Sequence, residues 1–463
     1  MASKTGKTKL HPAQSVRSLT GHAHEGIFPP FFSPPRIAQV HALVFQLQQS
    51  EWWSQERLLA HQLEQIRILG EHATATAPFY ADRLEAITGL QPGKLTLEAF
   101  RRIPVLTRAD IQAAGDQIFS RNPPPGHGKL RDIHTSGSTG QPVHVKTTVL
   151  AGTVNQAVGL RYHLWHRRDF AGKNITIKNM VSSEKVKKDI NWVMGYPSGP
   201  SMVFNIATPH NELFDSVIKE DPDYLCCFPS TLWELIQRSR ELGIKPGRLR
   251  EVRTICEVLS DELRNLCRDQ WDVPVSDNYS SEEFGILSVQ CPDHPWGHIQ
   301  EKVLLEVLDD EDQPCAAGKM GRVVATALHN FATPLIRYEL GDYAELGPAC
   351  PCGRGLPVLK RIVGRKRNLL VLPTGEKLFP LFDVEPVIFS MPVRQYQMIQ
   401  KTLETIEMRL VADRPLKAKE EQQLREYYCR NFRYPFQFEF VYVDEISRSA
   451  GGKFEDFRSE VGG

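Results

Sequence analysis

The chain has 463 residues, 41% hydrophobic and 24% charged, which excludes a disordered or fibrous protein and predicts more than one packed domain. Its 56 basic residues nearly balance its 55 acidic ones, whereas proteins that bind nucleic acid through its phosphates usually carry a basic excess. Nucleic acid is therefore not an expected partner. The sequence offers no apolar run of the ~18 residues that a membrane span needs, and no apolar run follows the lysine-rich start, so we expect a cytoplasmic protein without membrane contact.

Helical and strand-like patterns alternate along the first two thirds of the chain. Residues 1–36 are polar and then rich in proline and phenylalanine, which predicts a flexible tail. Residues 37–73 carry apolar side chains at helical spacing. Short apolar runs then alternate with helices, which is typical of an α/β sheet with covering helices. We expect strands at 222–228, 252–256 and 273–276 and helices at 230–242 and 261–270.

The pattern changes to β-runs beyond residue 299. We expect a β-rich subdomain with strands at 302–308, 321–328, 334–338 and 360–363. After a polar break at 364–368, the sequence predicts a hairpin, helices at 382–390 and 416–431, and strands at 395–402, 405–411 and 436–443. The predicted fold class is α/β: a large N-terminal domain (37–364) with mixed sheets covered by helices plus the β-rich subdomain, and a small α+β C-terminal domain (365–463).

One loop carries most of the functional information. Residues 135–142 read Thr-Ser-Gly-Ser-Thr-Gly-Gln-Pro. Glycines let backbone N–H groups approach a ligand closely, and the hydroxyl groups add donors that could cradle a polyphosphate. The loop lacks the Gly-Lys-Ser/Thr ending of a Walker loop and is not a Gly-x-Ser-x-Gly nucleophile elbow. A solvated surface loop is the alternative interpretation.

This loop closely resembles the phosphate-binding loop of the adenylate-forming superfamily, which includes acyl-CoA synthetases, adenylation domains and luciferases. Four further segments resemble motifs of the same superfamily, in the same order. They are Asn278-Tyr-Ser-Ser-Glu-Glu-Phe-Gly285, Pro334-Leu-Ile-Arg-Tyr-Glu-Leu-Gly-Asp342, the hinge motif Val363-Gly-Arg-Lys-Arg-Asn368, and Arg448-Ser-Ala-Gly-Gly-Lys453-Phe. The nearest resemblance is to the phenylacetate-CoA ligase and capsular-polysaccharide-protein branch, on segments 77–80, 222–230 and 350–354.

The resemblance implies that a carboxylate attacks the α-phosphate of ATP and releases pyrophosphate, after which the acyl group passes to CoA. Such transfer depends on positioning and on neutralising phosphate charge. The resemblance also implies a mobile C-terminal domain that rotates about Arg367, a position that is typically Asp or Lys in the family. The cofactors that it implies are ATP, Mg²⁺ and CoA.

The resemblance assigns roles to individual residues. Ser138 and Thr139 would bind the β- and γ-phosphates, Tyr279 would lie beside the adenine, and one carboxylate, Asp342, would accept bonds from both ribose hydroxyls. The full ATP-binding set is Thr135, Ser136, Gly137, Ser138, Thr139, Gly140, Tyr279, Ser280, Asp342 and Arg365.

Two further roles concern charge at the reacting phosphate. Glu283 is the expected Mg²⁺ ligand and catalytic residue, with the adjacent Glu282 as alternative. Lys453 would bring its ammonium group to the pentavalent phosphorus on a glycine loop.

The acid-binding pocket is predicted around four residues, Phe228, Cys256, Glu257 and Phe284. An aromatic and partly polar lining points to an aryl or arylalkyl acid. Cys256 stands where a smaller glycine is usual in the family, which would shorten the pocket.

The nine cysteines are an odd number spread over a long chain, which does not fit a disulfide scaffold. Cys291, His298, Cys350 and Cys352 could instead hold a structural Zn²⁺, because three thiolates and one imidazole close its tetrahedron. His294 is the second choice for the imidazole, and free surface thiols are the alternative.

The expected partners are a small-molecule carboxylic acid and CoA, and a homodimer is left open. Transfer to a carrier-protein thiol, an amine or a hydroxyl acceptor is an alternative to CoA. A non-catalytic AMP-binding interaction protein is a second alternative, against which the intact Lys453, Asp342 and Glu283 argue.

Overall fold

The computed structural model describes residues 34–135, 142–180, 186–188, 191–193, 196, 198–365, 368–380, 388, 391–449 and 452–461. Four groups of predictions therefore lie outside the described residues. They are residues 1–33 of the predicted tail, the phosphate-loop residues Ser136, Gly137, Ser138, Thr139 and Gly140, the hinge residue Arg367, and all of the predicted helix 382–390 except residue 388.

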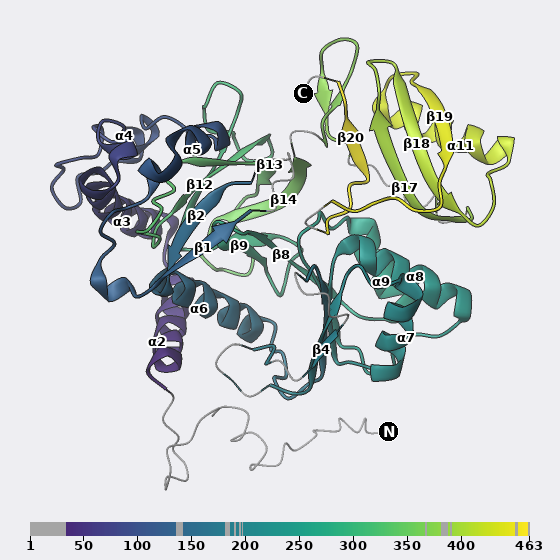
Figure 1. The fold of residues 1–463 in the computed structure, drawn as a ribbon, viewed down its shortest axis with the longest axis horizontal. Coiled ribbons are helices and arrows are strands. Elements are labelled where there is room, and N and C mark those ends of the chain that lie inside the picture. Colours follow the sequence, from purple (N-terminus) through teal and green to yellow (C-terminus); the bar gives the residue numbers. More distant parts are fainter. Residues whose placement is uncertain are drawn as a thin grey trace, which may run out of the picture.

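A mixed sheet of 12 strands runs through most of the chain, in the order β11-β12-β13-β14-β10-β9-β8-β7-β6-β3-β5-β4 (Figure 1). Its parallel part comprises β3 (Asn174–Lys178), β5 (Ser201–Asn205), β6 (Tyr224–Cys227), β7 (Glu251–Thr254) and β8 (Val275–Ser281), with β4 (Val186–Lys188) antiparallel at its edge. The antiparallel part comprises β9 (Gly285–Gln290), β10 (Gly297–Ile299), β11 (Val303–Leu308), β12 (Met320–Ala327), β13 (Tyr338–Leu346) and β14 (Val358–Arg365). The mixed α/β class predicted from the sequence is confirmed.

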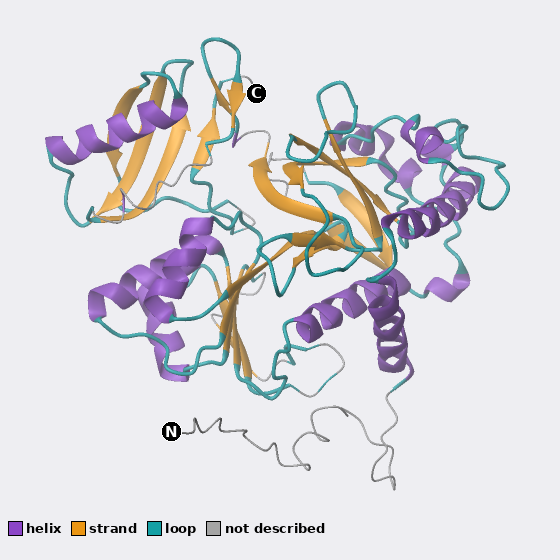
Figure 2. Cartoon of the chain, turned by 180° about the vertical axis from the view of Figure 1, so that it is seen from behind, coloured by secondary structure: helices purple, strands orange, loops and turns teal. Residues whose placement is uncertain are grey.

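Helices cover both faces of the parallel part (Figure 2). On one face lie α7 (His210–Glu220), α8 (Pro229–Leu242) and α9 (Asp261–Trp271), and on the other α6 (Val149–Trp165), against which α2 (Pro35–Ser50) packs. The four residues of β6 are all buried, as expected for a parallel strand covered on both faces. The α8 and α9 boundaries agree with the predicted helices to within one residue.

Smaller elements complete the N-terminal part. The helical pattern over 37–73 belongs to two helices, α2 and α3 (Gln55–Thr76), because Ser54 caps a new helix by accepting the N–H of Arg57. The remaining elements are α4 (Leu97–Arg101), α5 (Arg108–Ala114), the 3₁₀ turns η1 (Pro78–Tyr80), η2 (Gly115–Ile118) and η3 (Pro125–His127), and a hairpin of β1 (Leu130–His134) and β2 (His144–Thr148).

The predicted strand at 334–338 is wrong, because β13 begins only at Tyr338. Pro334 has no N–H to donate to a ladder. Arg337 adopts a left-handed φ of 51°, and its guanidinium donates to the Arg101 carbonyl over 2.6 Å and to Glu306 over 2.9 Å. The segment still bonds to the end of β12, where Leu335 O accepts the Ala327 N–H over 3.0 Å, but the left-handed conformation of Arg337 interrupts a regular strand ladder.

The C-terminal part forms a separate sheet of four strands in the order β19-β18-β17-β20. These strands are β17 (Val393–Gln400), β18 (Thr405–Ala412), β19 (Gln437–Tyr442) and β20 (Phe457–Ser459), preceded by the hairpin β15 (Leu370–Val371) and β16 (Lys377–Leu378). Helix α11 (Ala418–Phe432) covers one face and buries Tyr428 and Phe432. The sheet lies beside α8, whose Trp233 donates to the Arg394 carbonyl over 3.2 Å (Figure 1).

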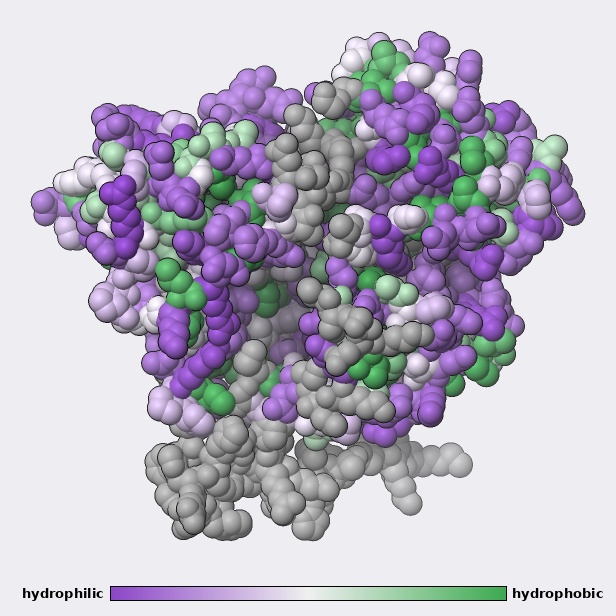
Figure 3. Space-filling model, viewed as in Figure 1, coloured by the Kyte–Doolittle hydropathy of each residue, from purple (hydrophilic) through white to green (hydrophobic). Residues whose placement is uncertain are grey.

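The face of the molecule drawn in Figure 3 is mostly hydrophilic among the described residues, with hydrophobic residues in scattered groups. Among the helices of the described segments, none is long and apolar enough to cross a membrane.

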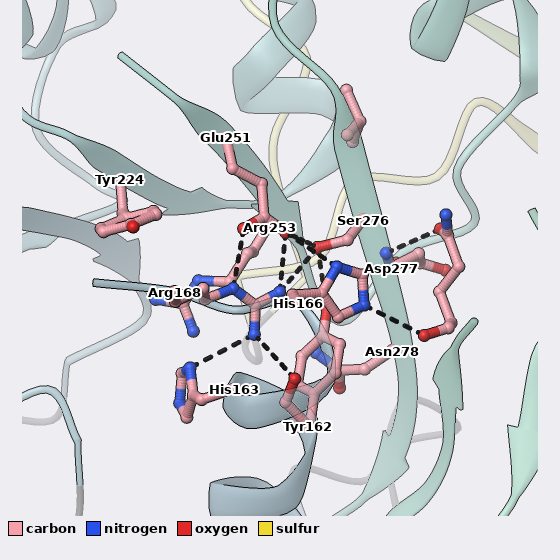
Figure 4. Close-up of polar contacts among 12 residues, drawn as sticks. Tyr162, His163, His166, Arg168, Tyr224, Glu251, Arg253, Ser276, Asp277 and Asn278 are labelled. Atoms are coloured by element: carbon pink, nitrogen blue, oxygen red, sulfur yellow. Dashed lines mark hydrogen bonds and ion pairs between the residues drawn. The ribbon is translucent and has the colours of Figure 1, made fainter. Parts of the chain in front are cut away.

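A buried network of charged and polar groups joins the end of α6 to β7 and β8 (Figure 4). Arg168 donates to both carboxylate oxygens of Glu251 over 2.7 Å and to Ser276 Oγ over 3.0 Å. Ser276 also accepts the Tyr162 hydroxyl over 2.8 Å and donates to Glu251. The Arg168 side chain is fully buried and that of Glu251 is 8% exposed, so the pair is almost completely removed from water.

We expect that removing one partner of this pair is costly. Glu251→Leu or Arg168→Met should each lower the free energy of unfolding by about 3–5 kcal/mol, because the remaining charge stays buried without compensation. The double variant should lose less than the sum of the two single losses, as measured by urea unfolding. Glu241→Gln, which breaks the exposed pair with Arg238, is the control and should cost at most about 1 kcal/mol.

Candidate functional site

Three of the predicted ATP-binding residues meet in the structure. Tyr279 lies on β8, whereas Asp342 and Arg365 are paired in the register of β13 and β14. The Tyr279 hydroxyl donates to Asp342 Oδ2 over 2.7 Å, and Arg365 Nε lies 3.3 Å from Asp342 Oδ1. Burial and then the charge of Asp342 raise the pKa of Tyr279 well above its ordinary value, so the phenol stays a donor. The carboxylate is thus fixed between a neutral donor and a cation.

The two candidate Mg²⁺ ligands lie in the turn between β8 and β9. Ser281 pairs with Gly285 across this turn and accepts the Phe284 N–H at its Oγ over 3.2 Å. Burial, followed by the charge of Glu283, raises the pKa of Tyr338 to about 12. Glu283 also raises the pKa of Tyr279, although less than burial and the charge of Asp342 do.

Glu282 acts on a different neighbour. Desolvation raises the pKa of the Cys256 thiol to about 11; the positive charge of Lys453 opposes this rise, and Glu282 adds to it. The charge of Glu283 thus acts on the pKa values of Tyr279 and Tyr338, whereas the charge of Glu282 acts on that of Cys256. Their assignment as metal ligand stays a prediction.

Thr135 anchors the base of the predicted phosphate loop. Its N–H donates to the Val143 carbonyl over 3.0 Å, and its Oγ1 accepts the Val143 N–H over 2.9 Å. The Thr135 hydroxyl therefore accepts a hydrogen bond from the backbone at the other end of the loop. Ser280, the other small member of the set, pairs with Ile286 in the β8–β9 ladder.

Lys453 follows a turn that is closed on itself. The Ser449 N–H donates to the Lys453 carbonyl over 2.9 Å, and the Gly452 N–H donates to the Ser449 carbonyl over 2.7 Å. Gly452 has a φ of 77°, and a Cβ there would lie 3.1 Å from Cβ of Asn179, so only glycine fits without strain. This turn therefore rests directly on the large sheet, where the charge of Lys453 reaches Cys256.

The four predicted pocket residues occupy different surroundings. Phe228 is buried in the core beside α8, and Phe284 stacks on Tyr338 at a centroid distance of 6.2 Å in the other large core. Cys256 has a left-handed φ of 71°, where the backbone favours glycine. Glu257 accepts the N–H of Phe454 over 2.6 Å, next to Lys453. Their role in binding an acid stays a prediction.

The four predicted zinc ligands lie together. Cys291 follows β9, His298 lies on β10, and Cys350 and Cys352 lie in the segment between β13 and β14. Their ligand atoms are all within 4.8 Å of one another, with 3.8 Å between Cys350 Sγ and Cys291 Sγ and 3.3 Å between Cys352 Sγ and His298 Nε2. Ligands ~2.0–2.3 Å from a tetrahedral Zn²⁺ lie roughly 3.3–3.8 Å apart, so the residues fit this ion.

His298, and not His294, completes this group. The ring of His294 instead stacks on Trp296 at a centroid distance of 5.6 Å. All three cysteines are free thiols rather than disulfide-bonded.

Asp277, which sequence reasoning missed, lies on β8 two residues before Tyr279. It accepts the Thr254 hydroxyl over 2.6 Å, and its N–H donates to Gln290 Oε1 over 3.0 Å. Burial raises its pKa to about 6, although the Thr254 bond, the charge of Arg264 and the Asn278 N–H each lower it. A carboxylate inside a strand next to the tyrosine motif was the available signal, but its burial depends on β7 and β9.

This raised pKa predicts a pH-dependent stability. The folded pKa lies above the ordinary aspartate value of about 3.9, so the cost of the buried carboxylate is absent at low pH and grows as pH rises through this window. Asp277→Asn should therefore raise the melting temperature relative to wild type at pH 7.5 but not at pH 4. Differential scanning fluorimetry across this range would measure the difference, with the exposed Asp116→Asn as control. A difference independent of pH would contradict the prediction.

Several known proteins are similar to this chain. A family model described as the CapK C-terminal domain matches residues 382–459. The chain is 26% identical over 377 residues to a phenylacetate-coenzyme A ligase of Thermus thermophilus, covering 78% of this chain and 82% of the relative. It is 22% identical to Protein CapK of Staphylococcus aureus, covering 81% of this chain and 83% of that protein.

The fold is similar to that of a solved 2-hydroxyisobutyryl-CoA ligase, with a TM-score of 0.67, 17% identity and 95% of each chain covered. Because the similarity covers 95% of each chain, it includes the small C-terminal sheet. Over most of its length, the chain is thus similar to phenylacetate-coenzyme A ligases and to Protein CapK, and its fold is similar to that of a solved CoA ligase.

Proposed function

We propose that the protein activates a carboxylic acid with ATP to an acyl-adenylate and pyrophosphate, and then transfers the acyl group to CoA, releasing AMP. The observation that carries this proposal is the convergence of Tyr279 and Arg365 on the Asp342 carboxylate, with Glu283 in the adjoining turn. A carboxylate held in this way can accept both hydroxyls of a ribose, and the tyrosine ring offers a face for the base.

The charges around this centre suit phosphoryl chemistry. Glu283, with Glu282 as second choice, would hold Mg²⁺, which when bound neutralises charge on the phosphates. Lys453 would supply a point charge to the α-phosphate from its closed turn. Both residues act by electrostatics and positioning, so neither needs to exchange a proton with the acid.

We propose an aryl or arylalkyl acid as the substrate. The phenylacetate-coenzyme A ligases among its relatives are named for such an acid and for CoA as acceptor. A carrier-protein thiol, an amine or a hydroxyl group is the alternative acceptor, and only the second half-reaction distinguishes them.

The first experiment measures pyrophosphate release with aryl, arylacetic, fatty and amino acids, with and without CoA. Acid-dependent release with a CoA-dependent thioester is the expected result. Release that does not depend on CoA, without a thioester, would keep adenylation and replace the acceptor. No release with any acid would contradict the proposal and favour a non-catalytic AMP-binding protein.

Lys453→Ala should lower acid-dependent pyrophosphate release by about 10²–10³-fold, because the developing charge on phosphorus loses its cation. The variant should still unfold like wild type, since the lysine side chain is partly exposed. Lys419→Ala, which removes an exposed lysine of α11, is the matched control and should keep full activity. Unchanged activity in Lys453→Ala would show that another group provides the charge.

We also propose that Cys291, His298, Cys350 and Cys352 bind a structural Zn²⁺. Four protein ligands leave no open position for substrate, so the ion would fasten the β9–β10 turn to the segment between β13 and β14.

Metal analysis of the purified protein should find about one zinc ion per chain, retained after dialysis. Cys352→Ser should lose the zinc and melt at a lower temperature, whereas Cys315→Ser, which lies outside the group, should keep it. A metal-free protein that is as stable as the zinc-loaded one would contradict a structural zinc site.

A further inference from the structure

Glu257 connects the large sheet with the turn on which Lys453 lies. It follows β7, and each of its carboxylate oxygens has a separate partner. Oε2 accepts the N–H of Ser230 over 3.0 Å, at the first turn of α8, and Oε1 accepts the N–H of Phe454 over 2.6 Å. The Glu257 side chain is only 9% exposed, so these bonds are shielded from competing water. One carboxylate thus links a fixed helix end to the residue directly after Lys453.

Arg448 makes a second connection on the other side of Lys453. Its Nη1 donates to Ser230 Oγ over 2.8 Å and lies 3.5 Å from Glu257 Oε1. The same nitrogen donates to the Gly452 carbonyl over 3.4 Å, inside the turn. The guanidinium therefore holds the turn and α8 at once.

A further carboxylate of α8 strengthens this contact. Glu234 Oε1 lies 3.7 Å from Arg448 Nη2, and its side chain is also 9% exposed. The Arg448 guanidinium lies over the Phe454 ring at 5.8 Å from its centroid. Two acidic groups of the large domain therefore meet one cation of the turn, in surroundings of low exposure where such attraction is strong.

We propose that Glu257 and Arg448 are positioning residues that hold Lys453 at the reacting phosphate during adenylation. Hydrogen bonds hold the chain on both sides of Lys453, through the side chain of Arg448 and the backbone N–H of Phe454. The backbone from which the ammonium group extends is therefore fixed. This inference rests on the proposed function, in which Lys453 acts on the α-phosphate. Because that charge is needed only while the acyl-adenylate forms, the two residues serve the first half-reaction and not the second.

The test separates the half-reactions. Glu257→Gln and Arg448→Met are assayed for pyrophosphate release with the acid that wild type uses best, and for thioester formation from synthetic acyl-adenylate of that acid plus CoA. Adenylation should fall about tenfold to a hundredfold in kcat, because misplacing a catalytic group by an ångström costs this much. The KM for ATP should change less than threefold in both variants, and the rate from supplied acyl-adenylate should change less than twofold in Arg448→Met, which lies outside the predicted acid pocket.

Two further variants distinguish positioning from general damage. Arg448→Lys keeps the positive charge and should recover part of the lost rate. The double variant Glu257→Gln/Arg448→Met should lose less than the product of the two single losses, because the contact between these two residues is lost in either single variant. Arg414→Met, which removes a pair with Glu420 on the exposed side of the C-terminal part, is the control and should match wild type.

Hydrogen–deuterium exchange gives a readout that needs no activity. The backbone N–H of Phe454 should exchange faster in Glu257→Gln than in wild type, because its acceptor is weakened. Equal loss of both half-reactions in Arg448→Met, or unchanged adenylation in both variants, would overturn the positioning role. A wild type that forms no acyl-adenylate would defeat the proposed function instead, and the exchange rates alone would then decide whether Glu257 anchors the turn.

Discussion

The double pairing of β8 is the constraint on which the rest of the structure depends. Its first half is parallel to β7, through Thr254 opposite Asp277, and its second half is antiparallel to β9, from Asn278 opposite Val289. One strand therefore joins the parallel and antiparallel parts into a single sheet. Because side chains alternate along a strand, a slip by one residue would turn Tyr279 away from Asp342 and dismantle the site.

The buried network around Arg168 fixes the register of this strand. Ser276 on β8 bonds to Glu251 on β7 and receives the hydroxyl of Tyr162 from α6. Such a network is satisfied in only one alignment of the two strands, and any other leaves a charge buried without partner. The polar groups beneath the sheet thus specify the geometry that the site at the end of β8 needs.

The local sequence pattern was sufficient to predict elements that are amphipathic and capped. It was insufficient where contacts with distant residues determine the backbone conformation. The α9 helix was predicted from its apolar spacing and begins after the Ser260 cap. The strand predicted at 334–338 failed because Arg337 is held by groups more than 200 residues away in sequence, such as the Arg101 carbonyl. In the site, Tyr279, Asp342 and Arg365 were predicted from motifs and lie together, whereas the burial of Asp277 arises only from packing.

Helix α8 connects the rigid nucleotide side of the site with the turn that brings Lys453. Its first turn bonds Glu257, and its Trp233 and Glu234 reach β17, where Gln395 donates to Glu234 over 2.7 Å. Most of these contacts are hydrogen bonds and ion pairs, and polar interfaces within a chain commonly permit relative motion. A contact of this kind can hold Lys453 firmly for one step and still separate for the next, as the expected rotation of the C-terminal domain requires. The position of the lysine is therefore set by a few directional bonds at one helix end, next to an apolar cluster that extends from α8 into the C-terminal part.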